Sequence, residues 1–291
     1  MDEGRHKIAI YGSRRQPDYL QDLPRLFKFL NDSGFRVYIQ NRFAEYLENN
    51  GVDLDQSVPS EHIPPEVSLV LSLGGDGTFL RAARWIGKRE IPILGVNTGH
   101  LGFLSSCGLS EAEEMIKEVC RGNIRIEKRM VIEVSSDAIP SEKWKYALNE
   151  IALMRYGSSM LSVNATIDQS FLAEYRGDGL IVTTPTGSTA YSLSAGGPII
   201  EPTIDCMCLC PVAPHTLTLR PLVVGADSEI ILNPESRSSN FILTIDDQSF
   251  VLPAKGTFTV RKADFSVLLI RKKDDGFPTI LRQKLLWSAT P

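Results

Sequence analysis

Long apolar stretches are absent from this sequence. No segment reaches the roughly 18 consecutive apolar residues of a membrane-spanning helix. The first apolar run, residues 7–12, is also too short for the apolar part of a signal peptide. These absences predict a cytoplasmic protein without a membrane partner.

An excess of positive charge is absent as well. The chain of 291 residues has 31 Lys and Arg against 35 Asp and Glu, a formal net charge of −4. This balance gives no overall attraction to nucleic acid or to an anionic membrane surface, so an anionic ligand must be held by a local arrangement of donors. The hydrophobic content of 43% suffices for one large domain or two of ordinary size.

Cysteine is scarce. Of the five cysteines, Cys206, Cys208 and Cys210 fall at alternate positions and would share one face of a strand. We interpret them as small apolar packing residues rather than as metal ligands, and we predict no protein ligands for a metal.

The first part of the chain alternates strand-like runs with segments of helical apolar spacing. Strands are expected at residues 7–11, 35–40, 67–73 and 91–96, and helices at 19–31, 78–86 and 110–121, the last capped by Ser110. This rhythm predicts a doubly wound, Rossmann-like α/β domain over residues 1–125. Residues 272–291 are expected to pack back on it.

From about Asn123 onward the pattern changes to short β-branched and alternating runs. It predicts a mostly antiparallel, β-sandwich-like domain over residues 126–271, with one helix at 190–196. The expected strands are 124–134, 146–154, 161–167, 179–183, 207–212, 217–224, 229–232, 241–245, 257–261 and 265–271.

The sharpest local pattern is Gly74-Gly75-Asp76-Gly77, which ends a strand-like run and precedes a helix. Glycines let backbone N–H groups approach a ligand closely, and a helix N-terminus favours negative charge, so the turn suits phosphate. Neither the P-loop pattern nor the Gly-x-Gly-x-x-Gly dinucleotide fingerprint occurs in the chain. The carboxylate of Asp76 would repel a phosphate unless it meets a cation or accepts a proton, both of which belong to phosphoryl transfer. The alternative is that Asp76 only caps the helix.

Residues 74–78, 97–103, 149–150 and 178–191 together, in this order, resemble the NAD kinase family. The run Thr-Pro-Thr-Gly-Ser-Thr-Ala-Tyr at 184–191 is the most specific of these segments, whereas Gly-Gly-Asp-Gly is shared with lipid kinases and, loosely, phosphofructokinases. The resemblance implies phosphorylation of the adenosine ribose 2′-hydroxyl of NAD by ATP.

Roles for individual residues follow from this resemblance. It implies that Asp76 accepts the hydroxyl proton, that Gly74, Gly75 and Gly77 hold phosphates, and that Arg81 lies near the ligand. Asn149 and Glu150 would bind the dinucleotide, Asp178 its nicotinamide end, and Phe103 and the ring of Tyr191 would contact it. Further contacts are implied for Arg176, Thr189, Ala190, Ser192, Leu193, Ser194, Ala213, Asp246 and Gln248.

The same resemblance implies Mg²⁺ arriving with ATP and a homo-oligomer, a dimer or tetramer. Two departures stand out: Asp246-Asp247-Gln248 replaces the expected Asp-Gly-Gln, and Leu104 follows Phe103 where an aromatic residue is common. We expect Asp247 to take the positive φ that glycine would take in a hairpin.

Two histidines invite a catalytic interpretation. We expect structural roles instead, His100 ordering its loop and His215 bonding a strand end, because neither stands beside a candidate nucleophile.

Parts of the pattern also occur in proteins of two other functions. A lipid kinase would need a membrane-docking apolar or basic segment, which is not evident. A nucleotide sensor that retains the pocket without catalysing transfer is disfavoured by the intact Asp76. The sequence leaves the choice between NAD and NADH, and between ATP and polyphosphate, open.

Overall fold

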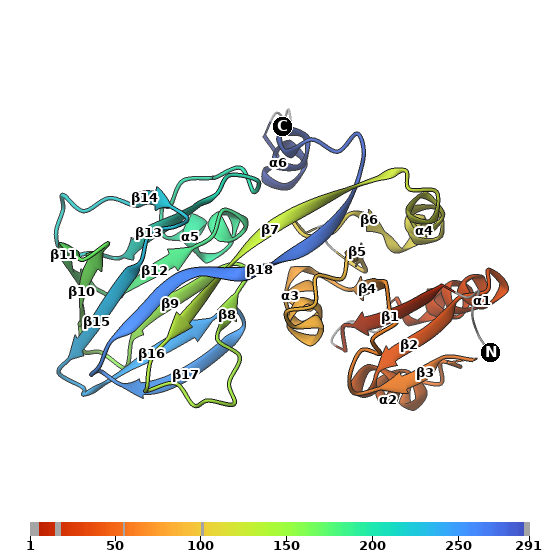
Figure 1. The fold of residues 1–291 in the computed structure, drawn as a ribbon, viewed down its shortest axis with the longest axis horizontal. Helices are drawn as coiled ribbons and strands as arrows, with labels where there is room; N and C mark the ends of the chain where they lie inside the picture. The colour runs from red at the N-terminus through yellow and green to blue at the C-terminus, as the bar shows by residue number, and fades with distance from the viewer. Residues whose placement is uncertain (1–5, 15–18, 55, 100–101, 288–291) are drawn as a thin grey trace. The chain divides into compact units, whose positions relative to one another are not determined.

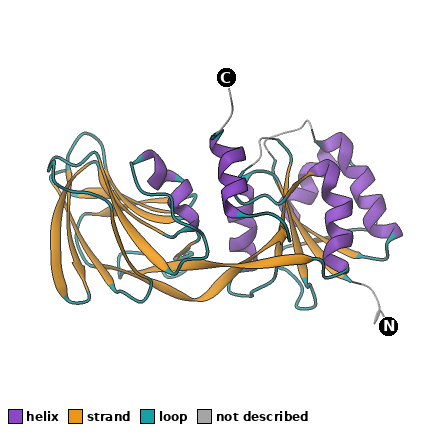
Figure 2. Ribbon diagram, turned by 90° about the horizontal axis from the view of Figure 1, so that it is seen from above, coloured by secondary structure: helices purple, strands orange, loops and turns teal. Residues whose placement is uncertain are grey.

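The computed structural model describes residues 6–14, 19–54, 56–99 and 102–287 and divides into two compact units (Figure 1). The first unit comprises Met1–Lys128 and Val267–Pro291, and the second comprises Arg129–Ser266. Helices flank the strands of the first unit, whereas the second is built mainly from strands (Figure 2). No helix in the described ranges is both long and apolar enough to cross a membrane.

The first unit is built on a parallel sheet whose strand order is β3-β2-β1-β4-β5-β18. This is the order of a doubly wound dinucleotide-binding fold. The strands are β1 (Lys7–Gly12), β2 (Arg36–Gln40), β3 (Val58–Ser60), β4 (Leu69–Leu73), β5 (Ile93–Asn97) with the short β6 (Cys107–Gly108) beside it, and the end of β18 (Phe258–Lys272). The strand order reverses between β1 and β4, and in such sheets a crevice opens at the carboxyl ends of these strands.

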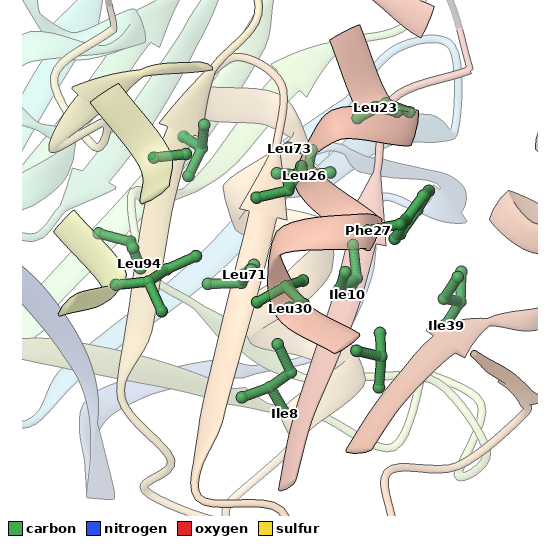
Figure 3. Close-up of a cluster of buried hydrophobic side chains, with 14 of the residues drawn as sticks. Ile8, Ile10, Leu23, Leu26, Phe27, Leu30, Ile39, Leu71, Leu73 and Leu94 are labelled. Carbon is green, nitrogen blue, oxygen red and sulfur yellow. The ribbon is translucent and has the colours of Figure 1, made fainter. Parts of the chain in front are cut away.

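Apolar side chains on one face of this sheet form the main core of the unit. Ile8 and Ile10 of β1 and Leu71 and Leu73 of β4 project to the same face, because alternate residues of a strand share a face. Figure 3 shows them beside Leu23, Leu26, Phe27 and Leu30 of the first helix. The helices are α1 (Leu23–Asp32), α2 (Asn41–Asn49), α3 (Asp76–Ile86), α4 (Ala112–Cys120) and α6 (Phe277–Leu285), with short 3-10 turns η1 (Leu20–Asp22) and η2 (Leu109–Glu111).

Some local expectations for this unit are wrong. Residues 41–49 form α2, which the sequence pattern did not indicate, and β3 was also missed. The predicted Ser110 cap is absent: Glu111 precedes α4, and its carboxylate accepts a bond from the Gly108 N–H at 3.2 Å.

The second unit contains two antiparallel sheets. One has the order β14-β13-β12-β9-β16-β17, and the other contains β11-β10-β15-β18. The strands of the first sheet are β9 (Glu150–Arg155), β12 (Gly179–Thr183), β13 (Cys206–Val212), β14 (Leu222–Gly225), β16 (Asn240–Ile245) and β17 (Gln248–Pro253). The others are β7 (Ile124–Ser135), β8 (Tyr146–Ala147), β10 (Leu161–Ile167), β11 (Ser170–Gly177) and β15 (Ile230–Ser236). The fold class expected from the sequence, an α/β domain followed by an antiparallel β domain, is confirmed.

A single apolar cluster joins these sheets. Phe241 of β16 and Phe258 of β18 meet edge to face with ring centroids 5.2 Å apart. Cys206, Cys208 and Cys210 are buried and free, in agreement with a packing role, and burial raises the pKa of the Cys208 thiol to about 12.

Turns and loops account for the differences from expectation in this unit. The predicted strand 146–154 is interrupted at residues 148–149, and the helical segment is a 3-10 turn η3 (Thr186–Thr189) followed by α5 (Tyr191–Ser194). Strands β11 and β17 were missed. In the hairpin between β16 and β17 it is Asp246, with φ of 49°, that takes the positive φ expected for Asp247.

Candidate functional site

The turn Gly74–Gly77, called the glycine turn below, lies at the carboxyl end of β4, where the strand order of the first unit reverses. Gly74 adopts φ of 151°, and a Cβ there would lie 2.4 Å from Thr78 Oγ1, so the turn requires glycine at this position. The Gly74 N–H donates to the carbonyl of Val96 at 2.9 Å, which fixes the turn to β5. The first N–H groups of α3, including that of Gly77, have no intrahelical acceptor and can bind an anion.

Asp76 is the first residue of α3, and its side chain does not cap that helix. Its carboxylate accepts hydrogen bonds from the main-chain N–H groups of Phe103 at 2.7 Å and Leu104 at 3.0 Å. Gly102 makes this approach possible, because a Cβ on Gly102 would lie 1.9 Å from Asp76 Oδ1. The helix-capping alternative for Asp76 is therefore wrong.

The loop that contacts Asp76 is anchored by a buried arginine. Arg271, near the end of β18, is 2% exposed, and its guanidinium donates to the carbonyls of Ser105 at 2.5 Å and of Phe103. Its Nε lies 3.7 Å from Glu127 Oε2, which compensates the buried charge. A buried ion pair between Arg271 and Glu127 thus helps to fix the loop.

Arg81 and Phe103 lie near this turn, whereas His100 falls outside the described residues. Arg81, one turn into α3, donates to Thr78 Oγ1 at 3.3 Å, which directs its guanidinium back toward the glycine turn. The side chain of Phe103 is half-buried. The residues predicted for phosphate binding and proton transfer are therefore gathered in one unit.

The second group of predicted residues surrounds the break between β8 and β9. The main-chain N–H groups of Leu148, Asn149 and Glu150 all donate to the carboxylate of Asp246, at 2.8, 2.8 and 3.1 Å. The Asp246 N–H in turn donates to the Glu150 carbonyl at 3.0 Å. Asp246 thereby positions the Asn149–Glu150 turn.

The carbonyls of the same turn are held from the segment that follows β12. Thr184 Oγ1 donates to the Leu148 carbonyl at 2.5 Å, and the Thr184 N–H and Thr183 Oγ1 donate to the Asn149 carbonyl at 2.9 and 3.0 Å. A Cβ on Gly187 would lie 2.2 Å from that Asn149 carbonyl oxygen, so only glycine fits. Bonds to both its donors and its acceptors therefore fix the turn.

Glu150 and Asp246 form a pair of neighbouring carboxyl groups. Burial, and then the charge of Asp246, raises the pKa of Glu150 to about 8. Desolvation raises the pKa of Asp246 to about 6, although its three main-chain donors act in the opposite direction. At neutral pH the proton therefore resides on Glu150, whose buried Oε2 has no partner among the described residues. A protonated carboxyl can donate a hydrogen bond to a ligand.

The segment 189–194 follows directly. Thr189, the last residue of η3, and Ala190, which follows it, are half-buried, and a bond from the Ala190 N–H to the Gly187 carbonyl at 2.8 Å closes the turn. Within α5, the side chain of Tyr191 is 41% exposed and available for stacking. Ser192 is fully buried, Leu193 half-buried and Ser194 exposed.

The remaining predicted residues of the second unit lie farther along its strands. Asp178 pairs with Arg155 at 2.7 Å, and Arg176 pairs with Glu174 at 2.8 Å, so both carry exposed ion pairs. Ala213 adopts φ of 43°, and the main chain of His215 donates to the Arg176 carbonyl at 2.9 Å. Gln248 Nε2 is buried without a partner in the described part of the chain.

Gly102 and Arg271 were missed as site residues by sequence reasoning. Gly102 lies in the quoted 97–103 segment, but its role depends on the approach of Asp76, which is distant in sequence. The sequence signal for Arg271 was weak, because β18 also carries Arg261, Lys262, Asp264 and Lys272. Across the described ranges no three His, Cys, Asp or Glu side chains cluster as metal ligands.

Known proteins resemble the chain over nearly its whole length. Residues 8–124 match the ATP-NAD kinase N-terminal domain, and residues 148–272 match the ATP-NAD kinase C-terminal domain. The chain is 42% identical over 288 residues to the NAD kinase of Bacteroides fragilis, covering 97% of this chain and 98% of the relative. It is also 42% identical over 286 residues to the NAD kinase of Porphyromonas gingivalis, with the same coverage of both chains.

Two solved kinase structures superpose on most of the chain. An NAD kinase from Archaeoglobus fulgidus in complex with ATP superposes with a TM-score of 0.70 at 29% identity, covering 92% of this chain and 94% of that chain. Yeast NADH kinase complexed with NADH has a TM-score of 0.85 at 24% identity, covering 99% of this chain and 89% of that chain, and it supports the fold.

Proposed function

The chain belongs to the ATP-NAD kinase family and phosphorylates NAD with ATP, and we propose that Asp76 accepts the proton of the adenosine ribose 2′-hydroxyl. The observation that carries this role is the fixed position of the Asp76 carboxylate at the glycine turn, held by the N–H groups of Phe103 and Leu104.

The reaction needs positioning and charge stabilisation more than a strong base. In a loose phosphoryl-transfer transition state the hydroxyl proton leaves late, so a carboxylate in the correct place is sufficient. The 2′-oxygen forms a bond to the γ-phosphorus, the bond from that phosphorus to the β–γ bridging oxygen breaks, and the proton passes to Asp76. The N–H groups of Gly75 and Gly77 hold phosphate oxygens at the turn. Arg81, directed toward the same turn, adds positive charge.

Residues of the second unit bind the dinucleotide in this proposal. The fixed Asn149–Glu150 turn offers an amide that can both donate to and accept from an adenine edge, and a carboxyl group for hydroxyls. Tyr191 offers a ring for stacking, with Thr189, Ala190, Ser192, Leu193 and Ser194 beside it. Arg176, Asp178, Ala213 and Gln248 contribute further contacts, Asp178 at the nicotinamide end. Asp246 contributes to dinucleotide binding indirectly, by holding the Asn149–Glu150 turn in place.

Magnesium enters this proposal with ATP. Mg²⁺ prefers phosphate oxygens and water with at most one or two carboxylates, and Asp76 provides a single carboxylate at the turn. The residues present thus fit a metal carried by the nucleotide. When bound, it neutralises charge on the phosphate oxygens.

We also propose that the enzyme is a cytoplasmic homo-oligomer, a dimer or tetramer. Phe171 of β11 is 68% exposed and Leu172 is 36% exposed, on a strand that ends the β11-β10-β15-β18 order. An apolar, unpaired strand edge suits contact with a second copy. Light scattering on the purified chain should give a mass of about two or four times 32.2 kDa, and a monomer would contradict this proposal.

The catalytic proposal is tested by incubating the full chain with NAD and Mg-ATP. Phosphorus NMR should show the new phosphate on the 2′-oxygen, and chelation of Mg²⁺ should stop the reaction. Asp76→Asn keeps the side-chain size, removes the basic group and leaves one acceptor oxygen for the two loop N–H groups, so its kcat should fall by about 10²–10⁴-fold. An Asp76→Asn enzyme with an unchanged rate would refute the role of Asp76.

A further inference from the structure

Asp178, which the proposed function places at the nicotinamide end of the dinucleotide, carries an ion pair with Arg155. The Nε of Arg155 lies 2.7 Å from Oδ1 of Asp178, and the two side chains are 37% and 44% exposed. The same guanidinium donates from Nη1 to the Gly157 carbonyl at 2.5 Å. The Arg155 N–H donates to the Asp178 carbonyl at 2.8 Å. Contacts of the main chain and of the side chain therefore hold Arg155 against Asp178.

The main chain that carries this carboxylate is fixed between two strands. The Asp178 N–H donates to the carbonyl of Val212, the last residue of β13, at 3.0 Å. On the other side, a Cβ on Gly179 would lie 2.5 Å from the carbonyl oxygen of Leu153 in β9, so only glycine fits there. The position of the Asp178 carboxylate next to Arg155 is therefore set by the fold of the second unit.

The ion pair and the Asn149–Glu150 turn lie at opposite ends of β9. Glu150 is the first residue of this strand and Arg155 is the last. The strand has six residues, so its ends lie about 16 Å apart. An extended dinucleotide with its adenosine at the turn would place its nicotinamide half toward the ion pair.

NAD and NADH differ in charge at this nicotinamide end. The nicotinamide ring of NAD is a cationic pyridinium, whereas the dihydronicotinamide ring of NADH is neutral. The two molecules otherwise offer the same carboxamide and ribose groups. An unpaired carboxylate would therefore favour NAD over NADH, and Arg155, at 2.7 Å, offsets the charge of that carboxylate.

We propose that Arg155 is a specificity-determining residue: by pairing with Asp178, it weakens the preference of the site for the cationic ring of NAD over the neutral ring of NADH. This inference rests on the proposed function, which assigns Asp178 to the nicotinamide end. Arg155 acts through Asp178 and needs no contact of its own with the dinucleotide, because a cation beside the carboxylate reduces the field at the ring. An ion pair this exposed adds little to stability, so its removal leaves a folded enzyme.

The experiment measures the ratio of kcat/KM for NAD to kcat/KM for NADH at saturating Mg-ATP. Arg155→Met leaves the Asp178 carboxylate unpaired, so the ratio should rise by about tenfold. Asp178→Asn leaves the guanidinium unpaired, so the ratio should fall by about the same factor. The double variant removes both charges, and its ratio should return to within about threefold of the wild type. Calorimetric titrations with NAD and with NADH should show the same shifts in the ratio of affinities, without turnover.

Two further variants separate charge from structure. Arg155→Lys keeps a cation beside Asp178 and should keep the ratio within about threefold of the wild type. Lys262→Met breaks another exposed ion pair of the second unit, with Asp205 at 2.8 Å, and should leave the ratio unchanged. Loss of the bond to the Gly157 carbonyl would affect both dinucleotides alike and cancels in the ratio. The shift in Arg155→Met should also shrink at about 1 M salt, which screens exposed charges.

Two results would overturn the proposal. One is an Arg155→Met enzyme whose ratio stays within about twofold of the wild type. The other is a change of the ratio in the same direction in Arg155→Met and Asp178→Asn, since these variants remove opposite charges. If Arg155→Met does not fold, Asp178→Asn is judged alone, and an unchanged ratio overturns the proposal. In each case NADP formation by the wild type would leave the proposed function standing, whereas a wild type that forms no NADP would refute the function itself.

Discussion

The carboxylate of Asp76 accepts a hydrogen bond from the main-chain N–H of Phe103 at 2.7 Å, across 27 residues of sequence. This bond joins the glycine turn after β4 to the loop after β5, which are neighbouring strands of the parallel sheet. The proposed proton acceptor is thus positioned by the main chain of a loop. The shape of that loop should therefore control the reaction.

Gly102→Ala should disrupt this arrangement. The added Cβ would lie 1.9 Å from Asp76 Oδ1, so either the carboxylate or the loop must move. We expect kcat to fall by about 10²-fold because a displacement of about 1 Å at a catalytic group has effects of this size. Steady-state assays with saturating NAD and Mg-ATP measure it. Gly108→Ala is the control, since its Cβ would meet only Ser110 Oγ at 3.9 Å, and a Gly102→Ala enzyme as active as this control would contradict the account.

Arg271→Met should destabilise the first unit. The substitution leaves Glu127 without its buried partner and two loop carbonyls without a donor. Removing one member of a buried ion pair costs about 3 kcal/mol. Urea unfolding of the whole chain measures the free energy. The control Lys272→Met removes an exposed pair with Glu111 and should cost less than about 1 kcal/mol, so equal losses in both variants would argue against a buried anchor.

The α/β half of the fold was largely predictable from sequence. Leu71 and Leu73 lie in a run that is buried on both faces, as strands of a parallel sheet are, and the glycines that follow mark its end. The helix α2 was missed because its apolar residues Phe43, Ala44 and Leu47 are few and its start has no Ser, Thr or Asp cap; Gln40 accepts the Phe43 N–H instead.

The site was predictable only in part, because sequence patterns do not show which distant residues approach each other. The Gly74–Gly77 turn is a local feature and was predicted from its composition. Gly102 and Arg271 derive their importance from tertiary neighbours. In the hairpin, the carboxylate of Asp246 reaches back to the Asn149–Glu150 turn, and the positive φ falls on Asp246 rather than on Asp247.

Asp246→Asn should loosen the Asn149–Glu150 turn. An amide offers one acceptor oxygen in place of the two that receive three main-chain bonds. Loss of bonds to a charged group should cost about 2 kcal/mol of folding free energy and weaken NAD binding. Calorimetric titration with NAD measures the second effect. Asp247→Asn, at the neighbouring exposed position, is the control. If Asp246→Asn and this control bind NAD equally well, the hydrogen bonds from the Asn149–Glu150 turn to Asp246 are not needed for NAD binding.

Glu150→Gln should change how stability depends on pH. The folded chain holds the Glu150 proton up to about pH 8, whereas the unfolded chain releases it near the ordinary pKa of 4.5. Between these values the folded state binds more protons, so the contribution of Glu150 is fully present below about pH 4.5 and is lost as pH rises through about 8. Relative to the non-titrating Glu150→Gln, the wild type should lose up to roughly 5 kcal/mol over this range. Urea unfolding at several pH values tests this, and a difference that is constant with pH would contradict it.

The most direct test of the account uses one preparation of Asp76→Asn for two measurements. Calorimetry should give an NAD affinity within about threefold of the wild type, because our proposal assigns the dinucleotide contacts to other residues. Single-turnover formation of NADP from bound NAD and Mg-ATP should be slower by about 10²–10⁴-fold, because the proton has lost its acceptor. A variant that binds NAD normally and transfers the phosphoryl group at the wild-type rate would show that Asp76 is not the proton acceptor.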